Sequence, residues 1–261
     1  GIWKPIDVSG LTFGTNGFYL DFEDSSALGN DANGSNNFTV NNLTLIDQST
    51  DTPTNNYCTL NPLNSWGGAV LSEGNTKITS TTNTFDHTST NFEMNSGKWY
   101  FEIKTESHST GYSALAYFLA GTGTFKTEQT SWIASGDGSF GIGSNNQKNT
   151  DGVEVSDSFS QLTAGDIVQI AYDSDAGKAW FGINGTYLSS GNPTTAANPY
   201  FTSTKLQNNN VVLKFITYGS QGVSIANFGS PAFSISSGNS DGNGHGNFEY
   251  AVPSGYYALN S

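Results

Sequence analysis

Apolar and polar residues alternate with a period of two along most of the chain, which is the pattern of β-strands with one buried face. In the segment 97–105, Trp99, Phe101 and Ile103 fall on one face. The opposite face carries Lys98, Tyr100, Glu102 and Lys104. This alternation predicts a half-buried strand whose polar face meets solvent.

Two further segments alternate in the same way. One apolar row is formed by Leu115, Tyr117 and Leu119, and a second by Val211, Leu213 and Phe215. A sustained helical spacing of apolar residues is absent, since Gly or β-branched residues interrupt nearly every window. Many short strands separated by Gly, Asn and Ser therefore predict an all-β protein, an antiparallel β-sandwich of jelly-roll type.

The segment 165–185, "GDIVQIAYDSDAGKAWFGING", predicts a β-hairpin. Val168, Ile170 and Tyr172 form one apolar row before an acidic, Gly-containing turn, and Ala179, Phe181 and Ile183 form the matching row after it. Such alternating flanks around an Asp- and Gly-containing turn are typical of hairpins. The dipeptide Asn184–Gly185 predicts a second turn that reverses the chain in the same way.

Turn-forming residues divide the chain into three predicted parts. Residues 1–56 form an N-terminal β extension and connector, with strands expected at Phe18–Phe22 and Phe38–Leu45. Residues 57–236 form the β-sandwich. Residues 237–261 form a flexible C-terminal segment and a closing tail, because "SGNSDGNGHGN" is dominated by Gly and small polar residues.

The composition is acidic and poor in charge. Charged residues make up 12% of the 261 residues, and the net charge is −13 with a pI near 4.3. A surface of this sign repels phosphate backbones, so nucleic acid is not an expected partner. No apolar run reaches the length of a membrane span, so membrane insertion is not expected either. The chain begins with Gly1 rather than Met, so we expect a fragment or a processed product.

Candidate metal and cofactor chemistry is weak in this sequence. Cys58 has no second cysteine for a disulfide or a structural zinc site, so it is predicted to be a small buried hydrophobe. His87, His108 and His245 all fall in segments predicted to be polar loops. The run at Asp31, "DANGSNN", lacks the Gly and Glu positions of an EF-hand and predicts a turn-rich loop. We expect no metal site and no cofactor.

Four segments in order resemble the SPRY domain, a concanavalin A-like β-sandwich that serves as a binding module. They are "GKWYFEIKT", "GSFGIGSNN", "LTAGDIVQIAYDSDAGKAWFGINGTYL" and "VSIANFGSPAFSI". The resemblance covers about Tyr57 to Ile235. It implies a sandwich whose loops at one end contact partners.

The flanks, residues 16–63 and 246–261, resemble segments around SPRY-like domains in structural proteins of marine-type tailed phages. This resemblance implies a virion component, such as a tail fibre or a surface appendage, located on the particle surface. Its implied partners are other virion proteins and a host-surface glycan or receptor, and a homo-oligomer such as a trimer is compatible with it. A purely structural capsid or tail decoration or joining protein is the alternative.

Concanavalin-like sandwiches also include glycoside hydrolases, which resemble one another in an E-x-D-x-E strand. Here Asp21 and Glu23 share a face, as do Glu102 and Glu106, but neither pair belongs to such a triplet. We therefore expect no catalytic residue and no enzyme activity. A jelly-roll glycoside hydrolase remains the further alternative, and it would need paired carboxyl groups about 5 to 10 Å apart.

Two loops carry the candidate ligand-binding residues. His108 and Tyr112 lie in the loop 106–112, and Trp132 and Asp137 lie in the loop 123–138. An exposed aromatic ring can stack on the C–H face of a sugar while neighbouring polar groups bind its hydroxyls. The tryptophans outside these loops are predicted to pack in the core, as Trp side chains are highly buried on average. These are Trp66, Trp99 and Trp180.

Overall fold

The structure is a computed structural model, and it describes residues 8, 10–44, 47–48, 55–82, 85–107, 115–121, 138–219 and 222–261. Contacts divide the chain into two units, residues 1–56 with Ser261 and residues 57–260. Within the described residues the regular elements are β-strands and short 3₁₀ turns, η2 (Pro62–Asn64) and η4 (Leu188–Ser190), so the prediction of an all-β chain is confirmed. No helix in these ranges has the length and apolar character needed to cross a bilayer.

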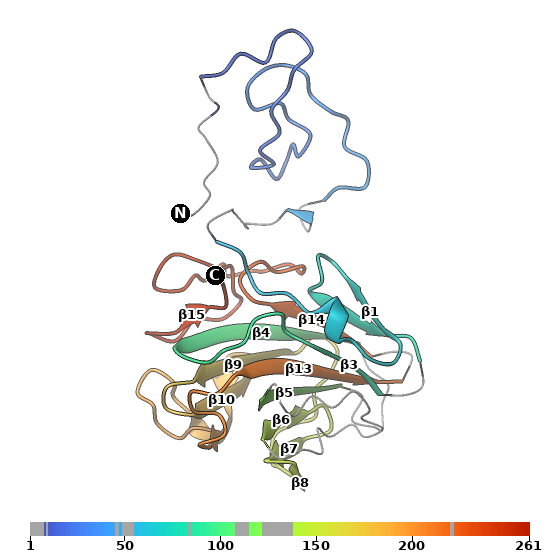
Figure 1. The fold of residues 1–261 in the computed structure, drawn as a ribbon. Coiled ribbons are helices and arrows are strands. Elements are labelled where there is room, and N and C mark those ends of the chain that lie inside the picture. The colour runs from blue at the N-terminus through green and yellow to red at the C-terminus, as the bar shows by residue number, and fades with distance from the viewer. Residues whose placement is uncertain are drawn as a thin grey trace. The chain divides into compact units, whose positions relative to one another are not determined.

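Residues 57–260 form two stacked antiparallel sheets (Figure 1). The larger sheet has the order β1 (Ala69–Ser72), β2 (Lys77–Ser80), β14 (Val223–Asn227), β4 (Lys98–Ser107), β9 (Ile167–Asp173), β10 (Lys178–Ile183) and β11 (Thr186–Tyr187). The short strand β12 (Phe201–Thr202) also pairs with β10, and β15 (Tyr257–Ala258) pairs in parallel with β4.

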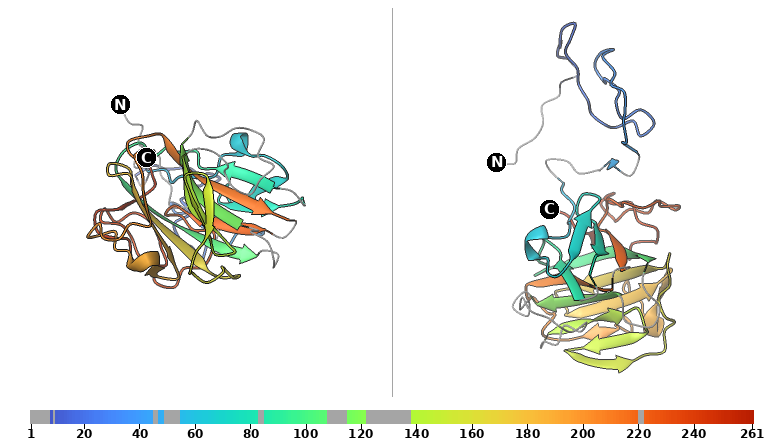
Figure 2. Two further views of the ribbon diagram at one scale, coloured as in Figure 1. Left: turned by 90° about the horizontal axis from the view of Figure 1, so that it is seen from below. Right: turned by 90° about the vertical axis from the view of Figure 1, so that its right-hand side faces the viewer.

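The smaller sheet has the order β3 (Phe85–Ser89), β13 (Val211–Tyr218), β5 (Leu115–Gly121), β6 (Ser139–Gly143), β7 (Gln147–Thr150) and β8 (Val153–Ser156). Figure 2 shows the two layers from two further directions. This architecture confirms the predicted antiparallel sandwich.

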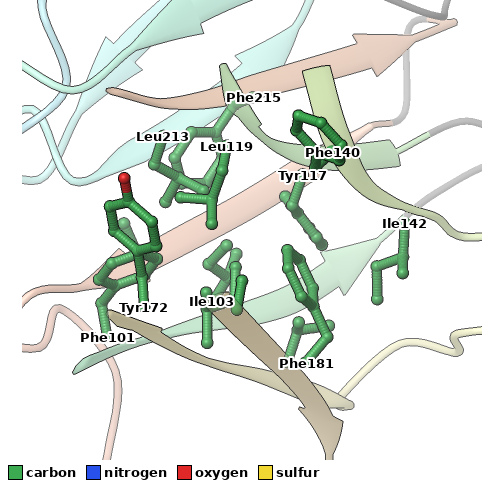
Figure 3. Close-up of a cluster of buried hydrophobic side chains, with 14 of the residues drawn as sticks. Phe101, Ile103, Tyr117, Leu119, Phe140, Ile142, Tyr172, Phe181, Leu213 and Phe215 are labelled. Atoms are coloured by element: carbon green, nitrogen blue, oxygen red, sulfur yellow. The ribbon is translucent and has the colours of Figure 1, made fainter. Parts of the chain in front are cut away.

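The inner faces of the two sheets form the main core (Figure 3). From the larger sheet come Phe101, Ile103, Tyr172 and Phe181, and from the smaller sheet Tyr117, Leu119, Phe140, Ile142, Leu213 and Phe215. All ten are nearly or completely buried. The three apolar rows predicted from alternation in segments 97–105, 113–121 and 211–219 therefore lie in this core, where Trp99 is partly buried.

The predicted hairpin is formed by β9 and β10. Val168 lies opposite Ile183, and Asp173 lies opposite Lys178. The turn between the strands contains Gly177 at a φ of +62°, and a Cβ there would lie 2.4 Å from the backbone oxygen of Ser203. Asn184 and Gly185 both have positive φ, the geometry that a tight two-residue hairpin turn requires.

The outer face of the larger sheet is also buried, which the sequence pattern did not predict. A second apolar cluster packs on it, built from strand residues and from the C-terminal segment. Its buried members are Tyr57, Tyr100, Ala171, Trp180, Phe248, Tyr256 and Ala258. Strand β4 is therefore buried on both faces, because residues 237–260 belong to the sandwich unit and cover it.

The C-terminal segment, which the sequence predicts to be flexible, forms a network of hydrogen bonds in the structure. The carboxylate of Asp241 accepts bonds from the backbone N–H groups of Asn243, His245 and Ala258 at 2.8–2.9 Å. Asn239 and Phe248 form a backbone bridge. The Gly-rich segment thus forms an ordered loop in which backbone N–H groups donate to the buried carboxylate of Asp241.

The two N-terminal strands expected at Phe18–Phe22 and Phe38–Leu45 are not formed in the described residues 10–44. Phe22 and Asn42 have φ values of +57° and +60°, which interrupt an extended backbone. The carboxylate of Asp31 accepts bonds from the N–H groups of Tyr19, Asn33 and Asn36 at 2.9–3.3 Å. These bonds confirm the predicted turn-rich loop, in which backbone N–H groups bond to a side chain rather than to a neighbouring strand. They also hold the pKa of Asp31 below its usual value.

Candidate functional site

The four predicted ligand-binding residues, His108, Tyr112, Trp132 and Asp137, lie outside the described residues. The strand ends that flank their loops are described. The loop with His108 and Tyr112 leads into β5 at Leu115, and the loop with Trp132 and Asp137 leaves β5 after Gly121. A strand of seven residues separates these anchors by about 20 Å. The two loops thus start from opposite ends of the sandwich.

The anchors near Gly121 form a polar surface that we name the Gly121 end, defined by Gly121, Gly138, Asp151 and Lys205. Gly121 pairs with Val211 of β13. The N–H of Gly138 donates to Asp151 Oδ1 at 2.7 Å, and Lys205 Nζ contacts both oxygens of Asp151 at 2.8–2.9 Å. The residue directly after Asp137 is therefore held by an ion pair on the β7–β8 turn.

The edge of the smaller sheet adjoins this end. Strand β8 is the last strand of the sheet and lies at the lower margin of the sandwich in Figure 1. Val153 and Val155 on β8 are 63% and 51% exposed. They lie opposite Thr150 and Lys148 of β7, on the face that carries Phe140 and Ile142 into the core. The inner apolar face thus continues to an uncovered edge.

Lys148 is the best-defined charged group on this face. Its Nζ lies 4.0 Å from the ring centre of Tyr200 and 5.0 Å from that of Phe201. Burial lowers the pKa of Lys148, and the nearby carboxylate of Asp157 acts in the opposite direction. Asp157 accepts a short hydrogen bond from the Tyr200 hydroxyl. These contacts hold the cation over two aromatic rings.

Strands β7 and β8 were not predicted from the sequence. The signal was present as "NTDGVEV", an Asp-Gly turn between alternating residues, which is a strong hairpin pattern. Asp151 and Gly152 both have positive φ, as that turn requires.

The carboxylates tested for catalysis are engaged in structural contacts. Glu102 is fully buried and accepts bonds from the Tyr100 hydroxyl and from the N–H groups of Glu249 and Tyr250 at 2.8–2.9 Å. Burial raises the pKa of Glu102. Glu106 instead forms an ion pair with Lys77 at 2.8 Å. Glu102 therefore binds the C-terminal segment under a covered face.

Asp21, the first member of the other tested pair, accepts a bond from the N–H of Glu23 at 3.1 Å. Among the described residues, no group of three or more His, Cys, Asp or Glu side chains could hold a metal ion. Cys58 is buried as predicted, and burial raises its thiol pKa to about 12.

His87 and Trp66 lie in other environments than the sequence predicts. His87 was expected in a polar loop, but it is buried in β3, where it pairs with Ile216. His245 lies in the C-terminal loop, with its Nδ1 atom 3.1 Å from Asn260 Nδ2. Trp180 is buried as predicted, whereas Trp66, whose backbone bridges to His87 of β3, is 49% exposed and does not pack in the core as predicted.

This architecture is similar to that of solved SPRY domains. The SPRY domain of human HERC1 superimposes with a TM-score of 0.50 at 13% identity, over 64% of this chain and 96% of that domain. The chain has a SPRY-type fold. The TRIM65 PSpry domain matches with a TM-score of 0.47 at 13% identity, over 66% of this chain and 92% of that domain. No protein-family model matches the sequence, and no curated protein does.

Proposed function

We propose that this chain is a non-enzymatic binding module of a tailed-phage particle, in a tail fibre or surface appendage, that recognises a host-surface glycan or receptor through the loops of its sandwich. One observation carries the proposal. In the SPRY-type sandwich, the paired carboxylates of β4 are engaged in structural contacts, since Glu102 accepts bonds from backbone N–H groups and Glu106 forms an ion pair with Lys77. Loops on a rigid scaffold are then the natural place for recognition.

The proposed contact residues are Trp132 and Asp137, in the loop that leaves β5 after Gly121, and His108 and Tyr112, in the loop that leads into β5 at Leu115. Their anchors at Gly121 and Leu115 make these two separate candidate surfaces rather than one. A sugar needs an aromatic platform with polar neighbours, and each loop offers one such set. The particle surface is the proposed location, with other virion proteins as further partners.

The test is binding of the purified chain to an array of bacterial envelope glycans, with Trp132→Ala and Tyr112→Ala measured in parallel. We expect one of the two substitutions to weaken binding by about tenfold or more, and the other to have little effect. Circular dichroism melting of each variant controls for folding. Absence of binding to every glycan and to intact bacterial envelopes by a folded chain would contradict the proposal.

A structural joining protein is the second candidate, and the described residues 10–44 favour it. Seven large apolar side chains in this range are 37–49% exposed, whereas Leu28 is its one buried apolar side chain. The exposed ones are Leu11, Phe18, Tyr19, Phe22, Phe38, Val40 and Leu43. So much uncovered apolar surface is typical of an interface. A map of the assembled particle separates the candidates, because joining requires this range to be buried against another subunit.

A further inference from the structure

Strand β8 presents an open backbone edge. Asp151 and Gly152 form a two-residue turn, so Thr150 and Val153 are a hydrogen-bonded pair and the pairs alternate from there. The N–H of Asp157 donates to the carbonyl of Asn146 at 2.8 Å, which fits this alternation. The backbone N–H and C=O groups of Glu154 and Ser156 consequently point away from β7. Within the described residues no other strand pairs with β8.

The side chains of β8 are sorted by face. Val153 and Val155, both more than half exposed, continue the inner apolar face of the sandwich. Glu154 lies on the opposite face, in the row of Asn149 and Gly141. A strand added beside β8 would therefore place alternate residues against the valines and the residues between them beside Glu154.

The charges at this edge are negative. Glu154 has no ion pair within the described part of the chain, whereas nearby Lys205 is paired with Asp151 and Lys148 lies over the rings of Tyr200 and Phe201. The whole chain carries a net charge of −13. A second copy of β8 would bring further Glu154 and Asp157 carboxylates to the same edge, so like charges oppose self-pairing.

We propose that β8 accepts an extended, basic segment of a partner protein as an additional strand of the smaller sheet. The segment would alternate apolar residues, which cover Val153 and Val155, with lysine or arginine residues beside Glu154. Its main-chain groups would bond to the outward groups of Glu154 and Ser156, which is the strand-addition mode of peptide recognition. This inference is independent of the glycan proposal, because it uses neither of the two loops proposed there.

The probe is a capped synthetic peptide of alternating Lys and Val, titrated into the intact chain and followed by backbone amide NMR. We expect shifts centred on 153–156 and slowed solvent exchange of the Glu154 and Ser156 amides. The matching peptide of alternating Glu and Val should not bind. Equal shifts at β1, the exposed edge of the larger sheet, or none at β8, would overturn the proposal.

Three variants sharpen this test. Ser156→Pro removes an outward N–H and keeps Glu154, so it should weaken binding about tenfold. Glu154→Lys reverses the charge and should weaken binding by at least as much. Val70→Lys is the matched control, because Val70 on β1 is 50% exposed and should leave binding unchanged.

Circular dichroism melting shows which variants fold. If Ser156→Pro does not fold, Glu154→Lys alone tests the proposal. Binding that is unaffected by either β8 substitution would contradict the proposal. Concentration-dependent shifts at β8 without peptide would also overturn it, since they would identify a second copy as the occupant.

Discussion

Gly177 and Gly74 share a φ of +62° but differ in their surroundings. A Cβ on Gly177 would lie 2.4 Å from a backbone oxygen, whereas a Cβ on Gly74 would meet nothing within 4 Å. We expect Gly74→Ala to cost about 1 kcal/mol from left-handed backbone strain alone, and Gly177→Ala to cost at least about 2 kcal/mol. Denaturant unfolding of the two variants measures both. Equal losses would show that the β9–β10 turn relaxes around the methyl group.

Glu102 and Glu106 lie on one strand and should respond differently to truncation. Glu102→Ala removes a buried carboxylate that accepts bonds from two backbone N–H groups, so we expect a loss of about 3 kcal/mol or more in the free energy of unfolding. Glu106→Ala breaks an ion pair whose carboxylate side chain is 43% exposed, and it should cost less than about 1 kcal/mol. Similar losses would mean that the C-terminal segment does not depend on Glu102.

Lys214 should make stability depend on pH in the alkaline range. Burial lowers its pKa to about 8 from the ordinary 10.5. Between these values the unfolded chain binds more protons than the folded chain, so the free energy of unfolding rises with pH. Relative to Lys214→Met, the wild-type chain should gain stability between about pH 7 and pH 9.5, a window that precedes most tyrosine titration. Parallel profiles of the two proteins would contradict this expectation.

At the scale of elements, the C-terminal segment, residues 237–260, packs on the outer face of the larger sheet. Phe248 is fully buried against Tyr100, with ring centres 5.1 Å apart, whereas Tyr257 is 38% exposed. We expect Phe248→Ala to cost about 3 to 5 kcal/mol, and Tyr257→Ala to cost about 0.5 kcal/mol. Thermal melts of both variants test this. A Phe248 variant as stable as wild type would show that the second apolar cluster contributes little.

Local sequence patterns predicted elements whose partners are adjacent in the chain or strongly apolar. The β9–β10 hairpin follows from two alternating rows and a turn, and the inner row of β4 follows from period two alone. The burial of Glu102 does not, because the segment that covers it lies about 150 residues further along. The strands expected at Phe18–Phe22 and Phe38–Leu45 are not formed in the described residues, because alternation alone does not provide a neighbouring strand with which to form backbone hydrogen bonds.

The candidate site was predicted less completely than the fold. The four proposed contact residues lie outside the described residues, and the structure gives only the anchors of their loops, which are at opposite ends of β5. Direction along a strand is a property of the assembled sheet, so it could not be read from either loop. The β7–β8 hairpin has a local sequence signal, but the sequence does not show that β8 is an edge strand. The exposure of Val153 and Val155 follows from that position, which is a property of the assembled sheet.

For the whole molecule, the structure is a SPRY-type sandwich with apolar clusters on both faces of the larger sheet, and the proposed partner surfaces are the end loops and the β8 edge. Hydrogen–deuterium exchange of the intact, unbound chain tests it most directly. We expect segment 248–258 to exchange as slowly as β4 and β9, and the outward amides of Glu154 and Ser156 to exchange rapidly. Exchange of 248–258 at the rate of an unstructured tail, with β8 protected, would contradict the account.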